Sequence, residues 1–392
     1  MTAVQSAPAA DSDAARIKVT HIITGLGRGG AERTLERLLP TLQAAGIDGR
    51  VIALGPEGPV GDTLRAQGFD VHALDGAGRA TLPVRLLQSL RRAPGDLVQT
   101  WMYHADLLGA LAALGAGRPP VVWNVRHTDP RQTDLAARTR AIARLCARLS
   151  ARLPAHVLCC GEQALAQHAA LGYERTRMSV LYNGFDTDRF RRDVQARAEL
   201  RARWQLAQDE LVIGVAARWH PHKGHTSLLK AVYALRAQQP ELRLALCGEG
   251  ITDENRELRA LLEGTGLDTA TLLLGERDDM PAFWNAVDIG CSPSIDEGLP
   301  NALGEAMASG LPCVSTDAGD SAALLGDCGY LVPRGNPDAL HDALGAVTAL
   351  DATARAEMGG RARSRICEQF SLRSMGDAYA AFYRQLIAPP PV

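Results

Sequence analysis

Two carboxylates stand at the ends of the segment 297–305, which reads Glu297-Gly-Leu-Pro-Asn-Ala-Leu-Gly-Glu305. An apolar run at 289–291 precedes this segment, and proline at position 300 suits the first turn of a helix. Free backbone N–H groups in such a turn attract an anion, and Gly298 lets the main chain approach a phosphate closely. The carboxylates can accept paired hydrogen bonds from sugar hydroxyls. The segment predicts a site for a sugar linked to phosphate; the alternative is that Glu297 caps the helix and Glu305 is solvated.

Two cations follow another apolar run, Leu211 to Ala217, in the order Arg218-Trp-His-Pro-His-Lys223. Placed at the carboxyl end of a strand, Arg218 and Lys223 can neutralise a diphosphate and stabilise its charge as a leaving group. The chain uses arginine almost throughout and has lysine only at positions 18, 223 and 230. Three histidines lie nearby, at positions 220, 222 and 225. Lys223 would repel a metal there and no carboxylate is adjacent, so we expect no metal and no other cofactor.

A glycine-rich turn near the amino terminus follows the apolar run Lys18 to Thr24. Residues 25–30 match the dinucleotide pattern G-x-G-x-x-G. That pattern needs an acidic residue at the end of the second strand, and here the second strand ends at Leu54-Gly55. Gly29 and Gly30, opening a helix, can still receive a phosphate of another substrate.

Two histidines, His104 and His127, stand at the ends of predicted strands in the same half. They are either structural or placed at the edge of a ligand cleft. Asp186-Thr-Asp188 resembles a metal-nucleotide signature, but it follows Asn183-Gly184 and predicts a turn and a helix cap.

The stretch 133–153 predicts a basic amphipathic helix, with Arg140, Arg144, Arg148 and Arg152 at a spacing of four residues. Such a helix can lie on an anionic membrane surface, although an ordinary solvated face fits the pattern as well.

Composition narrows the classes of protein. The net charge of −2 over 392 residues argues against bulk nucleic-acid binding. Eight scattered cysteines lack metal-ligand spacing and suggest buried thiols in a reducing compartment. Residues 1–15 predict a disordered tail without the apolar core of a signal peptide, and no run is long enough to span a bilayer. We expect a cytoplasmic protein, with possible peripheral contact at the inner membrane surface.

Short apolar runs alternate with helical patterns along the whole chain. The runs that predict strands are 18–24, 50–54, 71–74, 97–101, 121–125, 157–160, 179–182, 211–217, 243–247, 271–274, 289–291 and 313–316. The pattern predicts an α/β fold with two Rossmann-like, doubly wound parallel sheets, whose strand ends face a cleft. We expect an N-terminal acceptor-binding domain at 16–185, a C-terminal donor-binding domain at 186–370, and a final helix at 371–392 that packs back on the N-terminal domain.

Taken together, these motifs resemble the GT-B superfamily and, within it, the retaining glycosyltransferases of family four. The resemblance runs from Gly29-Gly30 through Asn183-Gly184 and Arg218 to Glu297-x7-Glu305. The overall sequence pattern is similar to that of bacterial polysaccharide and lipopolysaccharide transferases. One departure is Asp320, where a second glycine is commoner; it leaves the identity of the sugar open.

The resemblance implies a role for each matching residue. Arg218 and Lys223 would hold the donor diphosphate, Glu305 the ribose, and Glu297 the sugar ring beside the reacting centre. His127 would contact the sugar hydroxyls, and His104 joins Gly29 and Gly30 on the acceptor side. The implied donor-binding residues are Arg218, Lys223, Glu276, Arg277, Gly298, Leu299, Pro300, Asn301, Ala302, Leu303 and Glu305.

The resulting hypothesis is a hexosyltransferase that uses a UDP- or GDP-linked sugar and a lipid-linked or polysaccharide acceptor, with retention of configuration and without a metal. Alternatives within the fold are a sugar-nucleotide epimerase and a phosphorylase. Alternatives of other classes are an NAD(P)-dependent oxidoreductase and a non-catalytic sugar-nucleotide binding scaffold.

Overall fold

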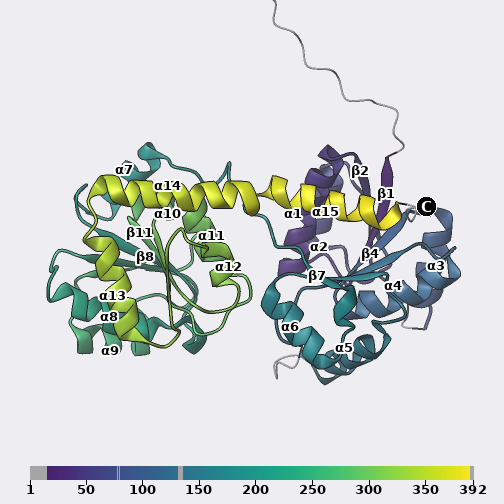
Figure 1. Cartoon of the computed structure of the whole chain (residues 1–392), viewed down its shortest axis with the longest axis horizontal. Helices are drawn as coiled ribbons and strands as arrows, with labels where there is room; N and C mark the ends of the chain where they lie inside the picture. The colour runs from purple at the N-terminus through teal and green to yellow at the C-terminus, as the bar shows by residue number, and fades with distance from the viewer. Residues whose placement is uncertain (1–15, 77, 79, 131–135, 389–392) are drawn as a thin grey trace, which may run out of the picture. The chain divides into compact units, whose positions relative to one another are not determined.

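The computed structural model describes residues 16–388 except 77, 79 and 131–135. The chain divides into two compact units (Figure 1). The first comprises the described parts of Met1–Asn124, Leu149–Val157 and Gly376–Val392, and the second those of Val125–Arg148 and Leu158–Met375. The tail predicted for residues 1–15 lies outside the described residues, and the domain ranges drawn from the sequence stay predictions.

All described strands belong to two parallel sheets, ordered β3-β2-β1-β4-β5-β6-β7 and β10-β9-β8-β11-β12-β13. The strands are β1 (Ile17–Ile23), β2 (Ile47–Ala53), β3 (Asp70–Ala73), β4 (Leu97–Trp101), β5 (Val121–Val125), β6 (His156–Cys159), β7 (Met178–Val180), β8 (Val212–Ala216), β9 (Arg243–Cys247), β10 (Thr271–Leu273), β11 (Ile289–Ser292), β12 (Cys313–Thr316) and β13 (Tyr330–Val332).

Helices connect the strands. They are α1 (Gly30–Ala44), α2 (Gly58–Ala66), α3 (Leu82–Arg92), α4 (Tyr103–Gly115), α5 (Ala137–Leu149), α6 (Glu162–Leu171), α7 (Val194–Arg203), α8 (His225–Arg236), α9 (Arg256–Thr265), α10 (Met280–Ala286), α11 (Asn301–Ala308), α12 (Ser321–Leu325), α13 (Pro337–Thr348), α14 (Ala352–Gln369) and α15 (Leu372–Ile387), with 3-10 turns η1 (Arg175–Arg177) and η2 (Pro221–Lys223).

The central strands are buried on both faces, which explains why their sequences read as continuous apolar runs rather than alternating ones. Every residue of β4, β5 and β11 is buried. In the six-stranded sheet, α8, α9 and α13 cover one face and α7, α10, α11 and α14 lie on the other (Figure 1). Leu228, Val232 and Leu344 belong to the first of these layers, and Phe283, Met307 and Ile366 to the second. The predicted α/β fold with two parallel sheets is confirmed.

Helix α15 belongs to the first unit from Gly376 onward and lies beside α1 (Figure 1). The hydroxyl of Tyr383 donates a hydrogen bond to Oε1 of Gln99 in β4. Nδ2 of Asn124 in β5 donates to the Tyr379 hydroxyl at 3.1 Å. Arg384 donates to the carbonyl of Ala45, directly after α1. All four aromatic and amide partners are buried, so the end of the chain is part of the core of the first unit.

The structure also bears on three smaller predictions, which concern the turn at Asp186, the cysteines and membrane-spanning helices. Asp186 Oδ1 accepts from the backbone N–H groups of Asp188 and Arg189, which makes 186–189 the predicted turn; the following helix α7 is capped by Asp193 instead. All eight cysteines are free thiols; seven are buried as predicted, and Cys367 is partly exposed. Among the described residues, no helix has both the length and the apolar character to cross a bilayer.

Candidate functional site: a cationic cavity at the carboxyl ends of β8 and β11

The loop after β8 is held in one conformation by packing against the loop after β11. Gly224 has a φ of +70°, and a Cβ added there would lie 1.9 Å from the carbonyl oxygen of Pro293. The N–H of Ile295 also donates to the carbonyl of His222 at 2.7 Å. Only glycine fits both the left-handed backbone and the close approach. The two loops are therefore fixed together, and Lys223 is carried against the β11 loop.

His225 holds the same loop through a hydrogen bond to its backbone. Its ring is buried, and Nε2 lies 3.0 Å from the carbonyl oxygen of Arg218, so this nitrogen carries the proton. Burial lowers the pKa of His225 and keeps the ring neutral. The ring stacks on Trp219 at 5.1 Å between centroids. The histidine thus orients the backbone at Arg218 and has a structural role.

Lys223 and Glu297 form the central contact of the site. Lys223 Nζ lies 2.6 Å from Glu297 Oε1, and Ser294 Oγ donates to the same oxygen at 2.7 Å. Both charged side chains are largely buried, with 21% and 16% of their surfaces exposed. Arg218 stands beside them, exposed and with no side-chain hydrogen bond or ion pair to another described residue. One cation is therefore positioned by a carboxylate, and a second is available to a ligand.

The helix predicted to follow Glu297 is present as α11. Pro300 is the N-cap, with an extended φ of −74° and ψ of 94°, and α11 starts at Asn301. No side chain caps this end. Leu299 therefore precedes the helix, and the uncapped N–H groups of its first turn remain available to an anion.

These residues surround one cavity of about 380 Å³. Its lining brings together Arg218, Lys223, Glu297, Leu299, Pro300, Asn301 and Ala302, which the sequence predicts, with Val215, Ala216, Ala217, Cys291, Ser292, Pro293 and Ser294. Gly298, Leu303 and Glu305 do not line it, although all three lie on the same loop and helix. The cavity combines two cations, a carboxylate and a helix amino terminus, which suits a phosphorylated ligand with hydroxyl groups.

Glu305 and Arg277 lie near the carboxyl end of the neighbouring strand β9. Burial raises the pKa of the Cys247 thiol to about 12, with the Glu305 carboxylate adding to the rise and Arg277 opposing it. Glu305 Oε2 accepts from Trp284 Nε1 at 3.5 Å, and Arg277 pairs with Asp279 at 2.5 Å. Glu276 is exposed. The structure thus groups Glu305 with Arg277 near Cys247, apart from the cavity lining.

The remaining candidates belong to the seven-stranded sheet. Gly29 is the N-cap of α1, which begins at Gly30. His104 lies in the first turn of α4, joined to β4 by the single residue Met102 with a φ of 75°. His127 follows β5 by two residues. All four candidates are at carboxyl ends of strands, as the sequence predicts.

Comparison with known proteins identifies the family. The family model "Glycosyltransferase Family 4" matches residues 28–189, and "Glycosyl transferases group 1" matches 210–349. The chain belongs to glycosyltransferase family 4. As a member of this family, it is an enzyme that takes its sugar from a nucleotide-sugar donor.

Individual relatives agree with this assignment. Over 313 residues the chain is 28% identical to EpsF of Bacillus subtilis strain 168, provisionally described as a glycosyltransferase, covering 77% of this chain and 79% of EpsF. It is 24% identical over 310 residues to the Escherichia coli UDP-Gal:alpha-D-GlcNAc-diphosphoundecaprenol alpha-1,3-galactosyltransferase, covering 78% and 79%. The crystal structure of Anabaena HepE with UDP shares the fold, with a TM-score of 0.80, 21% identity, and coverage of 94% of this chain and all of HepE.

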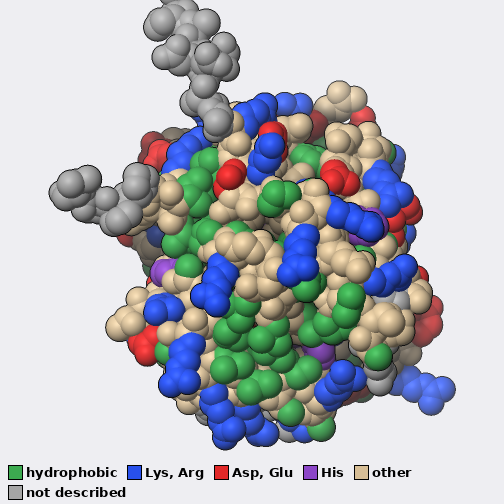
Figure 2. All heavy atoms as spheres, turned by 90° about the vertical axis from the view of Figure 1, so that its right-hand side faces the viewer, with side chains coloured by type: hydrophobic (Ala, Val, Ile, Leu, Met, Phe, Trp, Pro, Cys, Tyr) green, Lys and Arg blue, Asp and Glu red, His purple; other side chains and the backbone are tan. Residues whose placement is uncertain are grey.

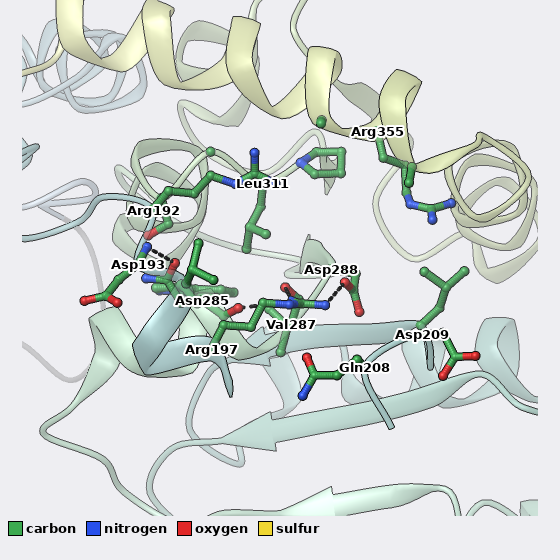
Figure 3. A pocket seen from close by; sticks show the side chains of 18 residues that line it. Arg192, Asp193, Arg197, Gln208, Asp209, Asn285, Val287, Asp288, Leu311 and Arg355 are labelled. Carbon is green, nitrogen blue, oxygen red and sulfur yellow. Dashed lines mark hydrogen bonds and ion pairs between the residues drawn. The ribbon is translucent and has the colours of Figure 1, made fainter. Parts of the chain in front are cut away.

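The glycosyltransferase also has a larger cavity, of about 580 Å³, at the opposite edge of the six-stranded sheet (Figure 3). Several charged side chains in and beside it make structural contacts. Arg197 pairs with Asp288 at 2.7 Å and donates to the carbonyls of Asn285 and Val287, and buried Arg201 also pairs with Asp288. Residues Leu211, Asp288 and Pro312 place this cavity at the amino ends of β8, β11 and β12. Ligands of such sheets bind at the carboxyl ends, which favours the smaller cavity.

Sequence reasoning did not select Ser294 as a site residue of the glycosyltransferase. A signal was present, since the stretch Ser292-Pro-Ser294 lies between a predicted strand and Glu297. The contact of Trp284 with Glu305 has no sequence signal, because it depends on how α10 packs on α11. In the part of the chain that is described, no three His, Cys, Asp or Glu side chains gather as a metal site.

Proposed function

We propose that this glycosyltransferase moves a hexose from a UDP- or GDP-linked sugar to a lipid-linked or polysaccharide acceptor, with retention of the anomeric configuration. The observation that carries the proposal is the cavity in which Lys223 contacts Glu297 and Arg218 stands unpaired among the described residues. UDP is the first donor nucleotide to test, since the names of the Escherichia coli relative and the HepE complex both contain it.

Arg218, Lys223 and the first turn of α11 would hold the diphosphate. Lys223 is already positioned by Glu297 and Ser294, so little side-chain freedom is lost when a phosphate binds. Each charge-assisted contact to a phosphate oxygen is worth about 1.5–3 kcal/mol. These contacts strengthen as negative charge develops on the departing phosphate, and this difference is what lowers the barrier.

Glu305 would bind the ribose, and Arg277 with Glu276 would lie beside the base. Their grouping near Cys247, apart from the cavity that would hold the diphosphate, fits a ligand that extends from one region to the other. His127 would contact hydroxyls of the transferred sugar, as the family resemblance implies. Glu297 would contact the sugar ring beside the reacting carbon.

The reaction would be a substitution on one face of the sugar. The bond from the anomeric carbon to the phosphate oxygen breaks, and a bond from the same carbon to the acceptor oxygen forms on the same face. The acceptor proton passes to the departing phosphate. The protein supplies charge and position, while Gly29, Gly30 and His104 would border the acceptor.

Peripheral membrane contact, at the cytoplasmic face, is part of the proposal. Figure 2 shows hydrophobic side chains gathered among basic side chains on the side where α3 and α4 lie. Leu111 and Leu114 of α4 are 50% and 47% exposed. On α5, Arg144 and Arg148 are exposed beside Leu145; residues 133–135 of the predicted basic helix lie outside the described residues. Apolar and basic groups together favour an anionic bilayer surface.

The main test uses Lys223→Ala and Glu297→Ala, with Lys230→Ala on the exposed side of α8 as the matched lysine control. Release of UDP or GDP from a panel of nucleotide sugars is measured with and without bacterial membranes as acceptor. We expect both site variants to lose about 10²–10³-fold in rate, and the control to keep its rate. Near-normal turnover in folded Lys223→Ala would contradict the proposal.

Two further measurements separate the alternatives. Tryptophan fluorescence titrations compare UDP and GDP with NADPH; binding of NADPH alone would favour an oxidoreductase. Co-sedimentation with phosphatidylglycerol and phosphatidylcholine vesicles tests the membrane contact, and equal retention on both would argue against an electrostatic surface.

A further inference from the structure

A second cationic cavity, of about 300 Å³, lies on the first unit. Its lining includes Arg28 from the loop after β1, Arg33 and Arg37 from α1, and Pro59 and Thr63 from α2. We call this group the arginine cradle. Because Arg28 follows β1 and Pro59 follows β2, the cradle is at the carboxyl edge of the sheet, where ligands of doubly wound folds bind.

The three guanidinium groups of the cradle are not committed to structure. Each arginine is exposed, and none of the three guanidinium groups makes a hydrogen bond or ion pair with another residue of the described chain. Three other arginines of the same unit pair with carboxylates: Arg16 with Asp48, Arg50 with Asp70 and Arg65 with Glu57. The guanidinium groups of the cradle are instead available to a ligand.

The placement of the cradle works against local stability. Arg33 and Arg37 are four residues apart on α1, where like charges repel along the helix. Arg28 adds a third positive charge, and Glu36 is the single carboxylate in the lining. Glu36 follows Arg33 by three residues and offsets only part of this charge, so the lining keeps a net positive charge that favours an anionic ligand.

The backbone beneath the cradle is well ordered by hydrogen bonds. The N–H of Leu26 donates to Pro56 at 3.2 Å, and the N–H of Val60 donates to Leu26 at 3.1 Å. Gly58 has a φ of +63°, and a Cβ there would lie 2.6 Å from the Leu26 carbonyl oxygen. The loop that carries Arg28 is thus fastened to the start of α2, so the positions of the cations are set before any ligand arrives.

We infer that the arginine cradle binds a phosphate or diphosphate group on the acceptor. The inference rests on the proposed function and gives its acceptor a chemical class. Arginine presents a planar fork of donors that matches phosphate oxygens, and three such forks suit a multiply charged group. The donor diphosphate has its own cations, Arg218 and Lys223, on the other sheet. Arg28 directly precedes Gly29 and Gly30, the residues proposed to border the acceptor.

The test compares full-length wild type with Arg33→Gln/Arg37→Gln. The matched control is Arg203→Gln/Arg256→Gln, which removes the same charge from exposed positions on α7 and α9. Saturating UDP or GDP fills the donor cavity. Calorimetric titrations then use geranyl diphosphate, glucose 1-phosphate and geraniol as probes. Geranyl diphosphate represents a lipid-linked acceptor and glucose 1-phosphate a soluble one.

We expect the double variant to bind the preferred phosphate probe about tenfold more weakly or worse, since one charge-assisted contact is worth at least that factor. Geraniol should not bind, and the control should match wild type. Tighter binding of geranyl diphosphate would assign the phosphate to a lipid carrier, and tighter binding of glucose 1-phosphate to a soluble sugar phosphate.

Equal affinities in wild type and double variant would overturn the inference, as would an equal loss in the control. A variant that loses only retention on phosphatidylglycerol vesicles would make the cradle part of a membrane surface and also overturn it. Nucleotide binding and acceptor-free release of UDP or GDP should stay unchanged in the double variant. Those two readouts fail only if the donor site itself is assigned wrongly, so the two failures are distinguishable.

Discussion

The two parallel sheets bury polar side chains in different places. In the six-stranded sheet, the buried polar residues of the strands are Ser292, Ser315 and Thr316, all at or next to a carboxyl end. In the seven-stranded sheet they include His21 and Gln99, in the bodies of β1 and β4, and Asn124, next to the carboxyl end of β5. In the six-stranded sheet these polar groups line or support a cavity, whereas in the seven-stranded sheet two of the three bond another element of the fold.

That other element is α15 for two of the three residues. Gln99 and Asn124 each bond a tyrosine hydroxyl of the helix. His21 Nδ1 accepts from Trp101 Nε1 at 3.3 Å, within the sheet. The buried polar side chains of the six-stranded sheet thus lie beside the proposed donor cavity, whereas those of the seven-stranded sheet make contacts within the first unit. The following variants are designed to test this division.

Gly224→Ala should give the largest effect, because it forces apart the loops that carry Lys223 and Glu297. A displacement of about 1 Å at a reacting centre can lower the rate about 100-fold. The matched control is Gly266→Ala, which has a similar φ of +64° at the end of α9 but no atom within 4 Å of the added Cβ. Nucleotide release is the measurement, and comparable losses in both variants would show that backbone strain, not loop contact, is responsible.

Tyr383→Phe should affect stability and leave the donor site alone. It removes the donor to buried Gln99 Oε1 and should lower the free energy of unfolding by about 1–2 kcal/mol. Urea denaturation followed by circular dichroism measures this, with exposed Tyr233→Phe as the control. A loss of nucleotide affinity in folded Tyr383→Phe would remove the proposed separation of roles.

The pH dependence of stability should distinguish Asp106 from the other groups of the first unit. Burial raises the pKa of Asp106 from 3.8 to about 7, partly offset by the hydrogen bond from Thr100. The folded state holds this proton more tightly than the unfolded state. The contribution of Asp106 to stability is therefore fully present below pH 3.8 and is lost as the pH rises towards about 7. We expect Asp106→Asn to gain on wild type across this interval, with exposed Asp62→Asn showing no such trend.

His21, in the same unit, should give stability the opposite dependence on pH. Burial lowers its pKa from 6.5 to about 3, so its contribution to stability is full above 6.5 and is lost as pH falls towards 3. Thermal unfolding of Asp106→Asn should therefore show stability rising with pH between about 4 and 6. A flat profile in that variant would contradict the assignment for His21.

Alkylation should show the smallest effect. Burial raises the pKa of the Cys247 and Cys291 thiols to about 12, so neither forms a thiolate at neutral pH. Brief treatment of the native protein with iodoacetamide should modify Cys367, the partly exposed cysteine, and leave nucleotide affinity unchanged. Mass spectrometry of tryptic peptides locates the label, and early labelling of Cys247 would mean that the donor unit opens.

Much of this architecture follows from the sequence, because buried parallel strands have a strong apolar signature. The bounds of β4, β5, β9 and β12 agree with the predicted ranges. The strand β13 was not predicted, since it has three residues at a sheet edge and two of them are exposed. Short edge strands lack both the burial and the length from which a pattern arises.

The site was predictable where chemistry fixes residue type and was missed where tertiary packing selects the residue. Lys223 and Glu297 stand out as charges at strand ends, and the structure brings them into contact. Ser294 bonds Glu297 because the loop after β11 folds back on itself over three residues, and Gly224 is required only because Pro293 passes close by. No periodicity or composition records such contacts.

The tyrosine contacts of α15 also set an order of events during synthesis. A ribosome makes β4 and β5 early, but their partners Tyr379 and Tyr383 emerge after the whole second unit. The second unit, whose residues end at Met375, can therefore fold while the first still waits for its last helix. In the nascent chain, the carboxamides of Gln99 and Asn124 remain unpaired for longest, and the first unit closes last although it is made first.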